Sequence, residues 1–178
     1  MEISVRTGLI AGVLALVLLS GCGSKDDSDS QANGEVAANG AEVLSAASLR
    51  EAAGEESTPV YWAGEQTGTR LELSRPSKGR TYVRYLTGDA KAGDRRASFL
   101  TVSTYVQSKA VAALRRQGKR AGGAISLAPG NATVYYERTD PQSVYLAYPG
   151  VPVEIEVYDP NFKRALQIVN SGQIVAIG

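Results

Sequence analysis

The sequence lacks the residue types on which many enzyme and metal sites depend. Among its 178 residues there is no histidine, one cysteine and one methionine, the initiator. Without an imidazole, a Ser-His or Cys-His nucleophile pair is excluded, and one cysteine cannot form a disulfide within the chain. Zinc and copper sites favour the same nitrogen and sulfur ligands, which leaves only oxygen-ligated calcium or magnesium open. Asp26, Asp27 and Asp29 lack the spaced ligands, central glycine and closing glutamate of a calcium-binding EF-hand loop, so we expect no cofactor and no metal site.

A long apolar run is also missing. The N-terminal apolar stretch, residues 9–19, is about half of the roughly 20 residues that a membrane-spanning helix needs. It follows Arg6 and precedes the small residues Ser20 and Gly21, which is the arrangement of a secretory signal peptide. We therefore expect export rather than a protein anchor.

Residues 19–22, Leu-Ser-Gly-Cys, place the single cysteine after an aliphatic residue and two small ones. This motif resembles the lipobox of bacterial lipoproteins. The resemblance implies that residues 1–21 are a signal peptide removed before Cys22, whose thiol then carries a lipid. Two or more acyl chains hold a protein stably at a membrane. The expected location is the extracytoplasmic side of the cell membrane or outer membrane; the alternative is an ordinary signal peptide with a chance cysteine.

Residues 22–45 are poor in large apolar side chains and rich in glycine, serine, alanine, asparagine and acid. Such a composition does not bury enough apolar surface to offset the loss of chain entropy, so it predicts a disordered tether. Residues 46–178 then form one extracytoplasmic domain, long enough for its own core. This domain has 17 lysines and arginines against 12 acidic residues, a net charge of +5.

The domain is predicted to be α+β, with an antiparallel β-rich fold and two helices packed on the sheet. Phe162, Ala165, Leu166 and Val169 form an apolar stripe on the last helix, which Asp159 is expected to cap. Helices are predicted over residues 46–53, 108–117 and 159–172. Strands, marked by β-branched and aromatic residues between turns, are predicted at 59–62, 70–73, 81–86, 99–105, 124–127, 133–137, 143–148, 153–158 and 174–177.

The segments around the last two helices form a weak repeat. Residues 58–62 resemble 132–136, residues 82–88 resemble 144–150, and residues 102–105 resemble 155–158. Each set is followed by a helix and a strand. This repeat predicts two similar β-rich halves, each packing one helix on antiparallel strands, unless it reflects only the preference of strands for valine and tyrosine.

Residues 59–64, 79–86 and 144–150 also look like segments of uncharacterised envelope lipoproteins from high-GC bacteria. Arginine outnumbers lysine, and alanine and glycine are abundant, as such a genome favours. The resemblance implies an envelope location. It brings no known activity and no functional residues.

Positive charge is concentrated between Asp94 and Glu137, an interval without any acidic residue. Four basic residues near the end of the second helix, Arg115, Arg116, Lys119 and Arg120, predict a surface for acidic lipid headgroups or an anionic cell-wall polymer. Nucleic acid is not an expected partner of an exported protein. The alternative is a solvated helix face whose basic end suits the helix dipole.

Tyrosine is the dominant aromatic residue, with nine copies against two phenylalanines and one tryptophan. Its apolar ring and polar tip suit a half-wetted binding face. Tyr61, Trp62, Tyr82 and Arg84 are therefore predicted to form part of a face that binds sugar or peptide. The alternative is that they lie at core edges and in cross-strand pairs.

Glu154 and Glu156 alternate with apolar residues, so both carboxylates are expected on one face of a strand. Paired carboxylates serve glycoside hydrolysis, whereas the polar face of a half-buried strand needs no chemistry. A Ser-Lys catalytic pair is another enzymatic possibility, but Ser108 and Lys109 are adjacent on the predicted helix and do not face each other. The expected function is a lipid-anchored, non-enzymatic binding or assembly module, with a carboxylate-dependent envelope hydrolase as the alternative.

Overall fold

The computed structural model describes residues 34–178. The predicted signal peptide, Cys22 and the first part of the predicted tether lie outside these residues. The described strands are β1 (Glu42–Leu44), β2 (Val60–Trp62), β3 (Thr69–Ser77), β4 (Arg80–Thr87), β5 (Thr101–Val106), β6 (Gly123–Ala128), β7 (Ala132–Glu137), β8 (Ser143–Ala147), β9 (Val153–Tyr158) and β10 (Val175–Ile177). The helices are α1 (Ala46–Gly54), α2 (Ala110–Gln117) and α3 (Phe162–Asn170), with a 3-10 turn at Pro129–Asn131. None of these described helices has the length and apolarity to cross a membrane.

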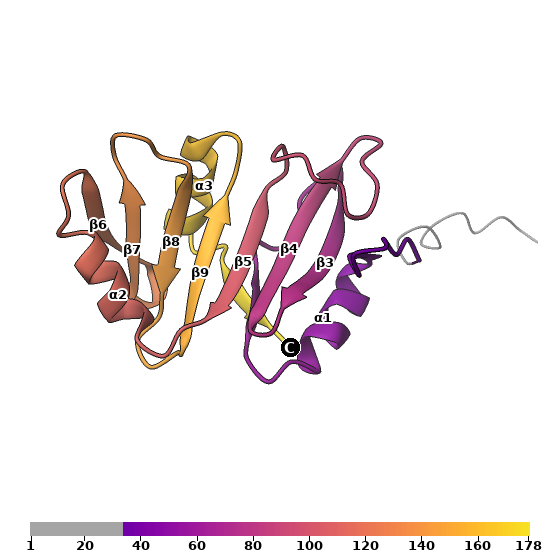
Figure 1. Cartoon of the computed structure of the whole chain (residues 1–178), viewed down its shortest axis with the longest axis horizontal. Helices are drawn as coiled ribbons and strands as arrows, with labels where there is room; N and C mark the ends of the chain where they lie inside the picture. Colours follow the sequence, from indigo (N-terminus) through magenta and orange to yellow (C-terminus); the bar gives the residue numbers. More distant parts are fainter. Residues whose placement is uncertain (1–33) are drawn as a thin grey trace, which may run out of the picture.

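Eight strands form one sheet in the order β1-β3-β4-β5-β9-β8-β7-β6, and β10 pairs with β2 in a separate ribbon (Figure 1). Every strand pair of the described chain is antiparallel. The predicted α+β class with an antiparallel, β-rich single domain is therefore confirmed. All nine predicted strands are present, and β1 is an additional one.

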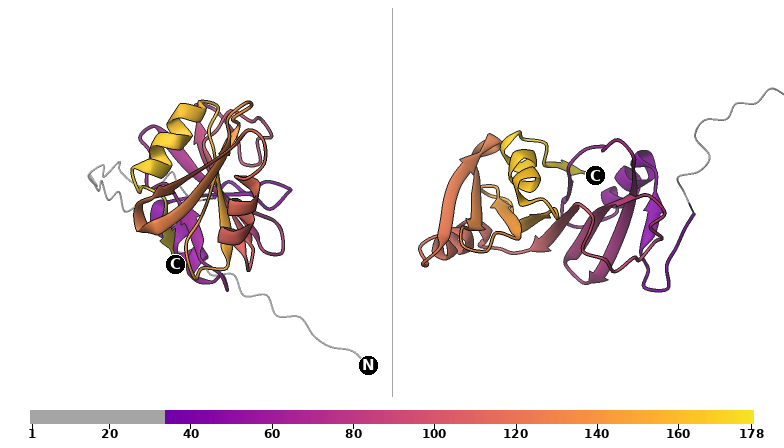
Figure 2. Two further views of the ribbon diagram at one scale, coloured as in Figure 1. Left: turned by 90° about the vertical axis from the view of Figure 1, so that its left-hand side faces the viewer. Right: turned by 90° about the horizontal axis from the view of Figure 1, so that it is seen from above.

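The two faces of the large sheet are covered differently. Along β9, Val153, Ile155 and Val157 are fully buried on one side, which we call the closed face. The β2-β10 ribbon, α1 and α3 cover this face and form the main core with it. The other side, the open face, carries α2 near β7 and β8 and the segment 88–98 near β3 and β4. Figure 2 shows α1 and α3 on one side of the sheet and α2 on the other.

The folded domain begins earlier than its composition predicts. Residues 42–44, assigned to the disordered tether, form the edge strand β1 beside β3, and Val43 is buried. Val36 makes an isolated bridge with Glu42. The prediction that the tether extends to residue 45 is therefore wrong at its end. A short edge strand is held by backbone bonds to its neighbour, so it needs little apolar pattern of its own.

The helix ends also differ from the prediction. Asn161 caps α3, since its side chain accepts from the Lys163 amide at 3.1 Å. Asp159 instead accepts from the Asn161 amide at 2.8 Å and pairs with Arg164 at 3.0 Å. In α2, the first helical residue is Ala110, and no side chain caps it. The predicted apolar stripe of α3 does face the core.

The two predicted halves meet at the centre of the sheet. β5 and β9, which the repeat aligns, pair with each other, and Ser103 lies opposite its counterpart Glu156. The repeat also aligns β2 with β7 and β6 with β10. Here too the pairing joins the two halves, because β6 pairs with β7 and β10 pairs with β2. The helices do not follow this relation, because α2 and α3 both pack on β8 and β9, from opposite faces. The expectation that each half packs its own helix is therefore wrong.

Candidate ligand-binding cleft

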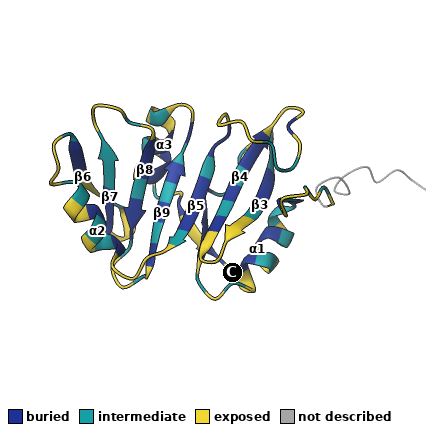
Figure 3. Cartoon of the chain, viewed as in Figure 1, coloured by how far each residue is buried: buried dark blue, intermediate teal, exposed yellow. Residues whose placement is uncertain are grey.

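A cleft of about 650 Å³ lies on the open face, over β3, β4, β5 and β9. Alternation decides which side chains reach it: Val83 and Tyr85 are buried in the core, so Tyr82 and Arg84 of the same strand face the cleft. Residues 93–97 form one wall. Figure 3 shows buried and half-buried residues alternating along β9.

The carboxylate of Glu156 lies at the floor of the cleft. It accepts hydrogen bonds from Tyr105 Oη at 2.6 Å, Ser143 Oγ at 2.7 Å and Tyr145 Oη at 3.2 Å. Strand order brings these donors together, because β5 and β8 flank β9. Within residues 34–178, no basic side chain pairs with Glu156. A carboxylate has about four acceptor sites, so about one remains for a donor on a ligand.

Burial keeps the two tyrosine hydroxyls beside Glu156 protonated. The pKa of Tyr145 is raised to about 12, first by desolvation and then by the charge of Glu156. Desolvation and the hydrogen bond to Glu156 also raise the pKa of Tyr105. Both hydroxyls therefore donate their proton to Glu156, and each retains oxygen lone pairs that can accept from another group.

Tyrosine rings supply the apolar part of the cleft. Tyr82 and Tyr105 meet edge to face, with ring centroids 6.1 Å apart and planes at 69°. The guanidinium of Arg80 lies over the Tyr105 ring, 5.8 Å from its centroid. Tyr158 Oη donates to the Ala97 carbonyl at 2.6 Å, which fixes this side chain against the wall. Tyr82 and Tyr158 are only half-buried, so part of each ring is accessible.

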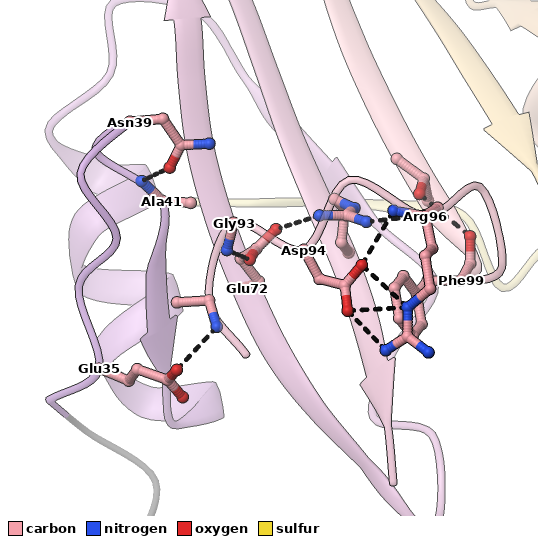
Figure 4. A network of polar contacts seen from close by, with 11 residues as sticks. Glu35, Asn39, Ala41, Glu72, Gly93, Asp94, Arg96 and Phe99 are labelled. Carbon is pink, nitrogen blue, oxygen red and sulfur yellow. Dashed lines mark hydrogen bonds and ion pairs between the residues drawn. The ribbon is translucent and has the colours of Figure 1, made fainter. Parts of the chain in front are cut away.

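A buried ion pair holds the wall to the sheet. Glu72 is 1% exposed, and it accepts from Arg84 Nη1 at 2.8 Å and from the Gly93 amide (Figure 4). Arg84 Nη2 donates to the Arg96 carbonyl at 3.2 Å. Asp94 accepts from the guanidinium and the amide of Arg96, and these bonds lower the pKa of Asp94 to about 2. The Glu72-Arg84 pair on the sheet and the Asp94-Arg96 pair in the wall thus each cancel their own charges.

The residues before β1 hold the same wall from its outer side. Glu35 accepts from the Ala92 amide at 2.9 Å and pairs with Arg70 at 3.3 Å. The bond from Ala92 is the main reason that the pKa of Glu35 is lowered. Gly93 has a φ of 73°, and a Cβ there would lie 2.8 Å from Ala37 Cβ, so this position requires glycine. The segment next to the predicted tether therefore shapes the cleft.

The structure brings together only two of the four residues predicted to form an aromatic binding face. Tyr82 and Arg84 line the cleft. Tyr61 and Trp62 lie on β2 beneath the closed face, 6% and 4% exposed, and Tyr61 stacks on Tyr148 with centroids 5.7 Å apart. The predicted four-residue face is therefore wrong, because β2 leaves the large sheet and pairs with β10.

The four basic residues singled out in the sequence are all exposed. Arg115 and Arg116 lie in the last turn of α2, and Lys119 and Arg120 lie in the turn after it. None of the four has an ion pair within the part of the chain that the structure describes. They therefore form a positively charged surface at one end of the open face.

Glu154 and Glu156 share one face of β9, as predicted, but they line different cavities. Glu156 lies in the cleft. Glu154 lines a second cavity of about 640 Å³ together with Arg120 and Tyr145. Burial, and then the charge of Glu156, raises the pKa of Glu154. A strand face alone thus does not bring two carboxylates to one site.

Four residues of the Glu156 cluster and the cleft are not singled out by the sequence: Tyr105, Ser143, Tyr145 and Tyr158. Each lies on the more polar side of a strand whose side chains alternate between the two faces of the sheet. These strands are β5, β8 and β9. That alternation is a usable signal for the face. It does not predict which strands lie side by side.

No protein-family model, no curated protein and no solved structure matches the chain. Within residues 34–178, no group of three or more histidine, cysteine, aspartate or glutamate side chains is arranged to hold a metal ion. Function is therefore inferred from the chemistry of the cleft.

Proposed function

We propose that the protein is a lipid-anchored envelope protein that binds a ligand in the open-face cleft without changing it chemically. The observation that carries this proposal is the combination of accessible tyrosine rings with a fixed carboxylate in a cleft of about 650 Å³. Pockets for small ligands have volumes of about 300–1,000 Å³ and combine apolar surface with a few placed polar groups. The cleft fits that description.

The acids of the cleft favour binding over catalysis. Glu72 and Asp94 are engaged by Arg84 and Arg96, and three hydroxyls occupy Glu156. A general acid or base must reach the proton that it transfers, and donors of the protein already engage both oxygens of each of these three carboxylates. These carboxylates are instead arranged as fixed acceptors and structural anchors.

A photo-cross-linker tests whether the cleft binds an envelope component. Arg95 lies exposed at the rim of the cleft, and Lys163 lies exposed on α3, across the sheet. We expect a cross-linker at position 95, but not one at position 163, to capture a discrete component in intact envelopes. Identical products from both positions, or none from position 95, would contradict the proposal.

Export and lipidation are supported by the Leu19-Ser20-Gly21-Cys22 motif and the apolar run before it. The Cys22 thiol is the only acceptor for a thioether-linked lipid in the chain. Cys22→Ser should therefore abolish incorporation of a fatty-acid analogue and release the protein from the membrane fraction. Equal labelling of the variant and the wild type would contradict the anchor.

The basic surface of α2 supports a second contact, with an anionic polymer of the cell wall. In Figure 1, α2 lies at the opposite end of the molecule from the first described residues, where the tether joins the domain. Arg115, Arg116, Lys119 and Arg120 are therefore distant from the point of attachment. This placement favours a partner away from the anchoring bilayer over the headgroups of that bilayer.

A carboxylate-dependent hydrolase is the second candidate function. The raised pKa of Glu154 favours it, because a general acid must keep its proton near neutral pH. Against it, Glu154 and Glu156 line different cavities, and Ser108 and Lys109 lie in a third. We expect no release of reducing ends from cell-wall glycan; release that Glu154→Gln abolishes would establish the hydrolase instead.

A further inference from the structure

We infer that the ligand of the cleft is an uncharged carbohydrate, bound along the tyrosine rings of β4, β5 and β9 with a sugar hydroxyl donating to Glu156. This inference rests on the proposed binding function and gives the chemical class of the ligand. It follows from the charge balance of the cleft and from the kinds of surface that its side chains present.

The charge balance disfavours an anionic ligand. Carboxylates and phosphates are typically held by arginines with free, paired N–H groups. Arg84 already donates to Glu72 and to the Arg96 carbonyl, and the Arg96 guanidinium is bound to Asp94. Arg95 at the rim and Arg80 over the Tyr105 ring have no ion pair within the described residues, and both are exposed to solvent.

The surfaces of the cleft match the two sides of a sugar ring. A pyranose has an apolar face of C–H groups and an edge of hydroxyls, each of which both donates and accepts. Tyr82 and Tyr158 offer partly exposed rings for the apolar face. Glu156 offers the remaining acceptor site of its carboxylate, and the bond that Tyr105 donates to it fixes the direction of that site.

A quaternary ammonium ion is the main rival, because it also packs on tyrosine rings beside a carboxylate. Two features count against it. The Arg80 guanidinium already lies over the Tyr105 ring. In addition, Glu156 is surrounded by hydroxyl donors, which reduce the field it presents to a cation.

Calorimetric titration of the full chain in detergent tests the inference. The uncharged probes are tetra-N-acetylchitotetraose and maltotetraose; choline and inorganic phosphate are the cationic and anionic probes. We expect at least one of the two oligosaccharides to bind, and neither choline nor phosphate. Binding of choline or phosphate without either oligosaccharide would overturn the inference.

Matched tyrosine variants locate the binding. Tyr82→Ala should weaken oligosaccharide binding about tenfold, equivalent to about 1.4 kcal/mol. Tyr105→Phe keeps the ring but removes the hydroxyl bound to Glu156, so it also should weaken binding. Tyr148→Phe is the control: it removes a hydroxyl that donates to the Ile174 carbonyl at 3.0 Å, beneath the closed face, and should leave affinity unchanged.

Tyr105→Phe keeps the test decisive if Tyr82→Ala does not fold. Unchanged affinity in Tyr105→Phe, or an equal loss in Tyr148→Phe, would overturn the inference. The cross-linking result separates the two proposals. If position 95 captures an envelope component but no oligosaccharide binds, the carbohydrate class is wrong and the binding function stands. If both experiments fail, both proposals fall.

Discussion

Along β9, neighbouring residues belong to two different environments. Val153, Ile155 and Val157 are fully buried on the closed face, whereas Glu154, Glu156 and Tyr158 are half-buried on the open face. The closed face holds the main apolar core, under α1, α3 and the β2-β10 ribbon. The cleft on the open face holds carboxylates, hydroxyls and arginines, and two smaller apolar clusters lie beside it, under the segment 88–98 and under α2. Along β9, residues that stabilise the core thus alternate with residues that face the cavities of the open face. The buried Glu72-Arg84 pair is an exception, because it lies on the open face and holds the structure together.

The largest loss of stability is expected when the Glu72-Arg84 pair is broken. Glu72→Ala leaves the Arg84 guanidinium and the Gly93 amide without their acceptor. Removing one partner of a buried ion pair lowers the free energy of unfolding by about 3–5 kcal/mol, whereas replacing both by apolar residues is often neutral. Urea unfolding should show the loss in Glu72→Ala and its recovery in a double variant, Glu72→Leu with Arg84→Leu. An unchanged midpoint in Glu72→Ala would show that the pair does not hold the wall.

Two adjacent residues of β9 test the separation of the faces directly. Ile155→Ala should lower the free energy of unfolding by about 2–5 kcal/mol, through lost burial and a cavity. Glu154→Ala should change it by less than about 0.5 kcal/mol, because the lost contacts are offset by relief of repulsion from Glu156. Denaturant midpoints of the two variants decide the point. Equal losses would mean that the open face carries as much stability as the closed one.

The Asp94-Arg96 ion pair of the wall makes the stability of the fold depend on pH. The pKa of Asp94 is lowered from its usual value of 3.8 to about 2, chiefly by hydrogen bonds from Arg96. Because the folded-state pKa lies below the unfolded one, this carboxylate stabilises the fold above about pH 4, and the contribution is lost as the pH falls through about 2. Carbon-detected NMR titration of Asp94 measures the shift. In Arg96→Ala the pKa should return toward 3.8; an unchanged titration would contradict the assigned cause.

The smallest effect on folding is expected at the basic end of the open face. Changing Arg115, Arg116, Lys119 and Arg120 to glutamine should leave the unfolding midpoint nearly unchanged, because exposed charges contribute little to stability. The same change should abolish co-sedimentation with purified anionic cell-wall polymer. In the wild type, salt should weaken that binding, since the screening length falls from about 10 Å at 0.1 M to about 3 Å at 1 M.

The control variant for the basic surface changes Lys78 and Lys163 to glutamine. Both lysines are exposed and lie outside the basic surface. Co-sedimentation of that control should equal that of the wild type. If the quadruple variant still co-sediments, the basic residues are a solvated helix face and no more.

Local pattern was enough to predict the α+β class, the strands and the two-faced character of β9. Alternation of side chains is a property of each strand's own backbone, and the apolar stripe of α3 is a property of its own helical period. Composition likewise excluded histidine-dependent chemistry before any fold was considered. Each of these features depends on residues close together in the chain.

Strand order was not available from such patterns, and the cleft depends on it. Tyr105 and Glu156 are 51 residues apart, yet they share a hydrogen bond because β5 pairs with β9. β2 pairs with β10 instead of joining the large sheet, so Tyr61 and Trp62 lie on the closed face. Likewise, β1 pairs with β3 at the edge of the sheet, although its residues belong to the predicted tether. A strand's alternation defines its two faces, but its neighbours are selected by long-range backbone pairing and by the packing of the whole core.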